Sequence, residues 1–243
     1  MTLLAPRAST EIPLPVARWL EVAWPVGLDT VDSVQFEGPV RVRRRRVWLR
    51  GDCTMRVQAA QGYVSDIRLG FGPLTTVRGL DAFVDGRGIM AIGRETTTGA
   101  EIDHGGFIAL WALSILFPSC WSRLPGLRWT PIDDAEALVA LPFRGGIETA
   151  TIRFKPDESS FPTAIEAERQ RVPGGPKVSW RAEYGDWHWR SGLALPTRLS
   201  ATWGGDATPW FDLRIDDVIP NAHVRDDLDR ANGVIEAHLA AAR

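Results

Sequence analysis

Apolar residues recur at helical spacing in three segments of the chain. Over residues 13–24 they occupy positions i, i+3, i+4 and i+7, and a proline opens the segment, where its missing N–H costs nothing. Near the other end the same spacing predicts a helix over 225–242. A long apolar run predicts a buried helix over 104–117, with Asp103 as its N-cap and Pro118 at its end.

Elsewhere apolar and polar residues alternate, as in strands with one buried face. The clearest case is 178–184, where Val, Trp, Ala and Tyr alternate with Ser, Arg and Glu. Asp85 followed by Gly86 favours a tight hairpin turn. Strand-like stretches occur at thirteen places, residues 31–36, 40–50, 53–59, 63–71, 75–84, 89–97, 127–131, 137–142, 148–155, 163–172, 178–184, 199–203 and 211–215. From them we expect a sheet of about ten strands.

These elements predict an α+β fold that is mostly β, with a large antiparallel sheet. Single β domains commonly reach the 243 residues of this chain. The sequence contains no internal repeat and no linker, and with 44% hydrophobic residues it can bury a sizeable core. We therefore expect one domain over residues 1–243.

The charge and hydropathy of the chain limit the classes of partner and the cellular compartment that we expect. A net charge of −2 gives no global positive field, which argues against nucleic acid as a partner. The longest apolar run, residues 107–118, is shorter than the roughly 20 residues of a membrane span, so no integral membrane segment is predicted. The first residues lack the apolar core of an export signal, which predicts a cytoplasmic protein. The oligomeric state is left open.

Motifs for metal or nucleotide chemistry are missing from the sequence. There is no P-loop, no G-x-S-x-G, no H-E-x-x-H and no strand-linked G-x-G-x-x-G, and the chain has only four His. Cys53 and Cys120 are too few for a zinc site and are expected to be small buried hydrophobes. We therefore expect neither a metal nor another cofactor.

The unusual feature of the composition is its eleven Trp against two Tyr. Indoles either fill the core of a large sheet or line a pocket that holds an apolar or flat ligand, because they are large and rigid. The second interpretation predicts a protein that binds an apolar small molecule. Its predicted wall consists of Phe107, Trp111, Phe117, Trp121, Trp180, Trp203 and Trp210.

A second hypothesis is a cofactor-independent cyclase, isomerase or dehydratase that acts on an apolar metabolite. Asp103 and His104 would carry its acid/base chemistry, because a helix dipole and burial can depress the pKa of an imidazole. Asp186 and His188, two positions apart on one predicted strand, are the reserve pair. Helix capping alone also explains Asp103, so the sequence does not decide whether the protein is an enzyme.

The stretch from Arg41 to Arg46 is basic except for Val42. Guanidinium groups at this density suit an anionic head group or a phosphate. A solvated edge strand, protected from aggregation by its charge, explains the same pattern and is the favoured interpretation.

Several short motifs resemble a bacterial family of uncharacterised proteins. They are residues 81–88 (Asp-Ala-Phe-Val-Asp-Gly-Arg-Gly), 131–134 (Pro-Ile-Asp-Asp) and 195–198 (Leu-Pro-Thr-Arg), the last followed by Trp203. Residues 184–203 are also similar to the lipoprotein-carrier type of fold. The resemblance implies a strongly curved antiparallel sheet, an open half-barrel that wraps helices around an apolar cavity, and it implies no catalytic activity.

Overall fold

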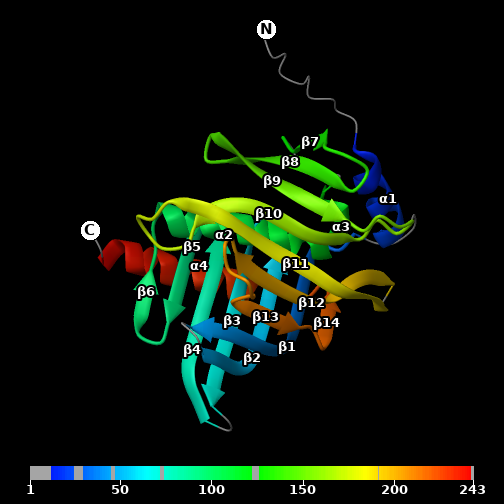
Figure 1. Ribbon diagram of the computed structural model, residues 1–243. Helices are drawn as coiled ribbons and strands as arrows, with labels where there is room; N and C mark the ends of the chain where they lie inside the picture. The colour runs from blue at the N-terminus through cyan, green and yellow to red at the C-terminus, as the bar shows by residue number, and fades with distance from the viewer. Residues whose placement is uncertain are drawn as a thin grey trace.

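The computed structural model describes residues 12–24, 30–44, 47–71, 74–121, 126–190 and 192–241 (Figure 1). Its helices are α1 (Leu14–Ala23), α2 (Ala100–Leu113), α3 (Pro118–Trp121) and α4 (Arg225–Ala241), with a short 3-10 helix, η1 (Ser114–Leu116). Its strands are β1 (Ser33–Arg44), β2 (Val47–Gln58), β3 (Gly62–Phe71), β4 (Leu74–Val84), β5 (Arg87–Ile92), β6 (Glu95–Thr97), β7 (Arg128–Pro131), β8 (Glu136–Phe143), β9 (Gly146–Phe154), β10 (Pro162–Gln170), β11 (Lys177–Arg190), β12 (Leu193–Trp203), β13 (Phe211–Arg214) and β14 (Asp217–Pro220).

All strands of the described residues belong to one antiparallel sheet made of two meanders. The first meander runs from β1 to β6 and the second from β7 to β13, and the two join where β1 pairs with β13. In that pairing Val40 lies opposite Leu213, and β14 extends it by pairing with Val34–Glu37 of β1. The order ends at β6 and β7 without closing, which confirms the predicted open, mostly β architecture.

Two of the predicted helices form where the periodicity placed them, and the third begins earlier. Helix α2 starts at Ala100 rather than at 104 and ends at Leu113 rather than at 117, and its N-cap is Gly99, which makes no side-chain cap. Pro118 begins α3 and does not end α2. The expectation that Asp103 caps this helix was therefore wrong. Its carboxylate instead accepts the backbone N–H of Gly88 at 2.6 Å, which ties α2 to β5.

The strands are longer and more numerous than predicted. Residues 31–36 and 40–50 were expected as separate strands, but β1 continues through Gly38 and Pro39. Gly38 serves as a close-approach position, because a Cβ there would overlap the carbonyl oxygen of Arg214. The arginine-rich stretch is also no edge strand, since β1 lies between β2 and β13.

The sheet has a concave face that packs on α2 and a convex face that α4 partly covers (Figure 1). Successive residues of β4 separate the two faces: Phe83 packs on Gly106 of α2, whereas Ala82 and Val84 pack in the cluster beneath α4. The Asp85-Gly86 turn between β4 and β5 has positive φ at both residues, 48° and 84°, as the predicted tight turn requires. Within the described residues, the helices are too short or too polar to cross a membrane.

Candidate functional site

Aromatic side chains gather in two regions of the concave face, and the first surrounds the second half of α2. Trp121 is the centre of this aromatic cluster and lies 6.2 Å from Trp19, 5.2 Å from Trp111 and 5.6 Å from Trp129, measured between ring centroids. Its indole N–H donates to the carbonyl of Ser114 at 2.8 Å. The rings contact one another from three helices and β7, so side chains fill this part of the interior.

Two further predicted wall residues, Phe107 and Phe117, also lie in this first region. Phe107 stacks on Phe143 with 4.3 Å between centroids and contacts Trp111 edge-on at 5.9 Å. Phe117 is completely buried. The structure thus brings Phe107, Trp111, Phe117 and Trp121 together against other rings of the protein.

The second region contains the other three predicted wall residues and differs in carrying a charge. Trp180 of β11 lies directly opposite Trp203 of β12, and the ring of Trp203 stacks on Trp210 at 6.4 Å. The guanidinium of Arg169, from β10, lies over both Trp180 and Trp203, at 5.2 and 5.4 Å from their centroids. Cation–π contacts of this kind favour a charged Arg in an apolar setting.

Arg169 reaches the opposite limb of the sheet, where Tyr63 of β3 is hydrogen-bonded to Asp81 of β4. Burial raises the pKa of Asp81, against the opposing effects of the Arg169 charge and the Tyr63 hydroxyl. Burial also raises the pKa of Tyr63 and lowers that of Arg169. Desolvation therefore opposes charge on every member of this polar cluster, which we call the Arg169 cluster (Tyr63, Asp81 and Arg169).

Polar hydrogens around the Arg169 cluster lack acceptors. Arg169 Nε and the indole nitrogens of Trp180 and Trp210 are buried and have no hydrogen-bond partner in the described part of the chain. All three atoms are donors that cannot accept. An unpaired buried donor costs about 1–3 kcal/mol. Three indole nitrogens of the first region, those of Trp19, Trp111 and Trp129, are unpaired among the described residues as well, so it is the guanidinium that distinguishes the second region.

Half-buried apolar side chains continue the concave face beside Trp203 and Trp210. Phe211, Val42 and Leu49 form one cross-strand row over β13, β1 and β2, and all three keep part of their surface exposed. On the neighbouring strands Val77 lies opposite Leu69. This row, which we call the apolar rim (Val42, Leu49 and Phe211), offers an accessible surface that the aromatic cluster around Trp121 does not.

Asp103 and His104 lie together at the first turn of α2, near the tips of the β8–β9 and β10–β11 hairpins. Asp103 pairs with Arg144 at 2.6 Å besides accepting from Gly88. His104 is buried, and its Nε2 lies 3.0 Å from Glu148 Oε2 and 3.4 Å from Lys177 Nζ. Burial opposes ionisation of Glu148, but the hydrogen bond and charge of His104 and the charge of Lys177 hold the pKa of Glu148 below its usual value.

Asp186 and His188 are not brought together by the structure. Asp186 has a φ of 54° and is skipped in the pairing of β11 with β12, which goes from Gly185–Arg198 to Trp187–Pro196. The register is the same on both sides of Asp186, and Asp186 and His188 are both exposed. Within the described residues no hydrogen bond joins their side chains.

The basic stretch is largely neutralised by aspartates on β13 and the loop before it. Arg41 and Arg198 share Asp212, whereas Arg43 pairs with Asp206 at 3.0 Å. Burial opposes ionisation of Asp212, but its two arginines lower the pKa of this carboxyl. These pairs leave little of Arg41 and Arg43 for an anionic ligand. Residues 45 and 46 lie outside the described residues.

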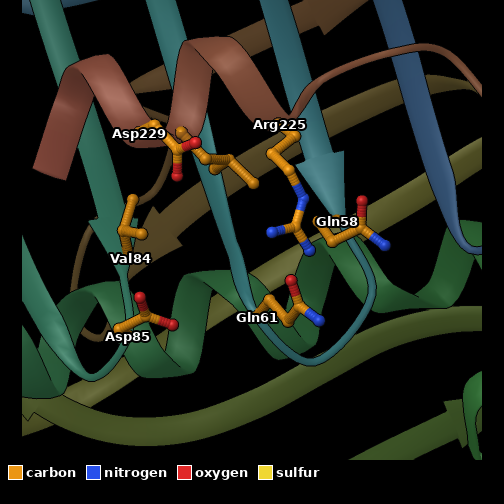
Figure 2. A pocket seen from close by; sticks show the side chains of 7 residues that line it. Gln58, Gln61, Val84, Asp85, Arg225 and Asp229 are labelled. Carbon is orange, nitrogen blue, oxygen red and sulfur yellow. The ribbon is translucent and has the colours of Figure 1, made fainter.

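A hollow of about 310 Å³ lies away from both aromatic regions, between α4 and the β2–β3 and β4–β5 turns (Figure 2). Polar side chains dominate its lining, with Gln58, Gln61 and Asp85 on the turns and Arg225 and Asp229 on α4. Gln58 already donates to the carbonyl of Asp32 at 3.0 Å. Its polarity distinguishes this hollow from the apolar site that the sequence predicts.

Cys53 and Cys120 are buried, as predicted. Burial raises the pKa of the Cys53 thiol to about 12, and the hydroxyl of Ser65 lies 3.6 Å from its sulfur. Within the described residues, no group of three or more His, Cys, Asp or Glu side chains is placed to hold a metal ion.

The fold and site define a class of protein: an open, curved antiparallel sheet whose concave face combines indoles with one buried guanidinium. The chain belongs to a family of unknown function, DUF6544, whose model matches residues 3–213. Membership of an uncharacterised family, expected from the sequence motifs, is thereby confirmed. Helix α4 lies beyond the matched residues.

Three solved structures are similar to the chain over most of its length. They are a LolA superfamily protein from Nitrosomonas europaea (12% identity, TM-score 0.46, 84% of this chain and 90% of that chain), a putative outer membrane lipoprotein-sorting protein domain from Vibrio parahaemolyticus (8%, 0.45, 89% and 98%) and a DUF1329 family protein from Desulfovibrio piger (10%, 0.43, 86% and 94%). These likenesses do not extend to a shared ligand or activity. No curated protein matches the chain.

The sequence analysis missed the Arg169 cluster. Its three residues come from β3, β4 and β10, so no local spacing connects them. Asp81 opens one of the family-like motifs, which was the one signal that pointed to it. Arg169 itself stands among Glu168, Gln170 and Arg171 and carries no mark of burial in the sequence.

Proposed function

We propose that the protein binds an apolar small molecule on the concave face of its sheet, against Trp180, Trp203 and Trp210. The observation that carries the proposal is the apolar rim beside these indoles, where Val42, Leu49 and Phe211 keep exposed surface. Burying such surface under a ligand contributes about 25 cal/mol per Å². The rigid indoles add contact area at a small entropic cost.

The remaining predicted wall residues have a different place in the proposal. Phe107, Trp111, Phe117 and Trp121 form the packed layer behind the site, and direct ligand contact is assigned to Trp180, Trp203 and Trp210. Preorganisation by this layer reduces what the site must order on binding, which is how rigid pockets gain affinity.

The test is a titration with a neutral apolar fluorophore, N-phenyl-1-naphthylamine, followed through energy transfer from Trp. We expect saturable binding to the wild type and a loss of about tenfold in affinity in Trp203→Leu, because the largest apolar surface of the site is removed. Trp189→Leu is the matched control, since Trp189 is 56% exposed and lies outside the site. Absence of saturable binding to the wild type, or equal affinities in the two variants, would overturn the proposal.

A second candidate function, acid/base catalysis on a bound apolar molecule, is favoured by the contact between His104 and Glu148. Nδ1 of His104 is buried and has no partner among the described residues, and Glu148 orients the ring through Nε2. Asp103 is engaged by Gly88 and Arg144, so it would position α2 while His104 moved the proton. Mass spectrometry of a ligand recovered after incubation tests it: conversion by the wild type and none by His104→Gln, at unchanged affinity, is expected.

A further inference from the structure

We propose that Arg169 receives a carboxylate on the ligand, so that the molecule bound is an apolar acid rather than a neutral hydrocarbon or an amine. The inference rests on the proposed function and names the chemistry of its ligand. It requires that the end of the ligand next to Trp180 and Trp203 accepts hydrogen bonds.

Among the described residues, the unpaired polar atoms near the proposed ligand are all hydrogen-bond donors. Arg169 Nε, Trp180 Nε1 and Trp210 Nε1 are buried without acceptors, and none of them can itself accept a hydrogen bond. A ligand group that donates would leave all three unpaired and would approach a cation. A carboxylate accepts hydrogen bonds through two oxygens, and its negative charge is opposite to that of Arg169.

The guanidinium of Arg169 is also held in place before any ligand arrives. Trp180 and Trp203 flank it, and a Cβ at Gly105 of α2 would lie only 2.5 Å from Arg169 Nη2. Arg cannot be deprotonated in a protein and binds carboxylates through a planar fork. A fixed fork loses little freedom on binding.

Asp81 is the acidic side chain of the Arg169 cluster, and its protonation state also favours an anionic ligand. Asp81 faces Arg169 together with Tyr63, and burial opposes the charged form of its carboxyl. When a ligand carboxylate supplies the negative charge beside Arg169, Asp81 can hold a proton and share it with Tyr63. The site thus exchanges one carboxylate for another without gaining a net buried negative charge.

The experiment compares three probes with the same alkyl chain, dodecanoate, dodecanol and dodecylamine, each displacing N-phenyl-1-naphthylamine below its micelle concentration. We expect dodecanoate to bind the wild type at least tenfold more tightly than dodecanol, because charge-assisted hydrogen bonds contribute about 1.5–3 kcal/mol. Arg169→Met should abolish that preference, measured as the ratio of the two affinities within the same variant. Arg171→Met is the control, since Arg171 also lies over Trp203, at 5.8 Å, but is half exposed and paired with Asp206.

Gly105→Ala provides a second variant if Arg169→Met does not fold. The added methyl displaces the guanidinium while keeping its charge, so the preference for dodecanoate should fall. Equal affinities of the wild type for dodecanoate and dodecanol, tighter binding of dodecylamine, or a preference that survives in Arg169→Met would each overturn the inference while the proposed function stands. Failure of dodecanol and the fluorophore to bind at all would instead overturn the proposed function.

Discussion

The two aromatic regions of the concave face use the same residue type for different ends. Around Trp121 indoles and phenyl rings contact one another across α1, α2, α3 and β7, and the space between the elements is filled. Around Trp203 a guanidinium lies over two indoles, and the indoles border the half-exposed apolar rim. The difference teaches that the number of Trp residues does not distinguish the two regions, whereas the guanidinium among them does.

The largest expected effect comes from breaking the filled region. Trp121→Ala should lower the free energy of unfolding by about 3–5 kcal/mol, because a fully buried ring is lost and its neighbours cannot collapse into the cavity. Urea unfolding at neutral pH measures it. A loss below about 1 kcal/mol would mean that this region is loosely packed and would remove the contrast between the two regions.

A smaller loss is expected from an ordinary ion-paired carboxylate outside both regions. Asp212→Asn should cost about 2 kcal/mol at pH 7, because Arg41 and Arg198 lose a shared charged acceptor. The pKa of Asp212 is lowered in the folded state, so its contribution is present at neutral pH and is lost as pH falls through that lowered pKa. The urea midpoints of the two proteins should therefore approach each other as the pH falls below the ordinary pKa of an Asp carboxyl, about 3.9. An undiminished difference there would contradict the assignment.

Removing the charges of the Arg169 cluster should not appreciably lower the free energy of unfolding, in contrast to Asp212→Asn. Arg169→Met combined with Asp81→Asn should leave the free energy of unfolding within about 1 kcal/mol of the wild type or raise it, because replacing buried charges by apolar or neutral groups of similar volume is often neutral or stabilising. Thermal unfolding without ligand measures this. A loss of more than about 2 kcal/mol would show that the charges serve the fold and would weaken their assignment to a ligand.

The smallest change in stability is expected from a substitution on α4, outside both aromatic regions. Gly233 lies on the exposed side of α4, far in the fold from either aromatic region, and an added Cβ would meet nothing within 4 Å. Gly233→Ala should raise the free energy of unfolding by about 0.5–1 kcal/mol through helix propensity. Chemical denaturation of the two proteins side by side measures it. Any effect on fluorophore binding would be unexpected.

Elements with a strong local period could be predicted from the sequence, and close approaches between distant segments could not. The helical spacing over 13–24 and 225–242 yielded α1 and α4 nearly to the residue. Two strands were expected at 31–36 and 40–50, but β1 runs through the residues between them, where Gly38 allows the backbone of Arg214 to come close. Asp103 looked like a cap because its partner, Gly88, lies on another element.

The same limit applies to the candidate site. Trp180 and Trp203 could be named as candidate ligand contacts because each stands on the apolar face of an alternating strand and the chain is rich in Trp. Arg169 could not, since nothing local distinguishes it from Arg171, which is half exposed. The curvature of the sheet, which brings β10 opposite β3 and β4, is a property of the whole chain and decides which arginine is buried.

The order of strands also has a consequence for how the molecule acquires its structure. Neighbours within each meander are close in sequence, so each can form from short loops, whereas the contact of Val40 with Leu213 must close most of the chain. Contacts of such long separation slow folding. We expect the two halves to gain hydrogen-exchange protection first, and the β1–β13 amides to become protected in the last and slowest kinetic phase.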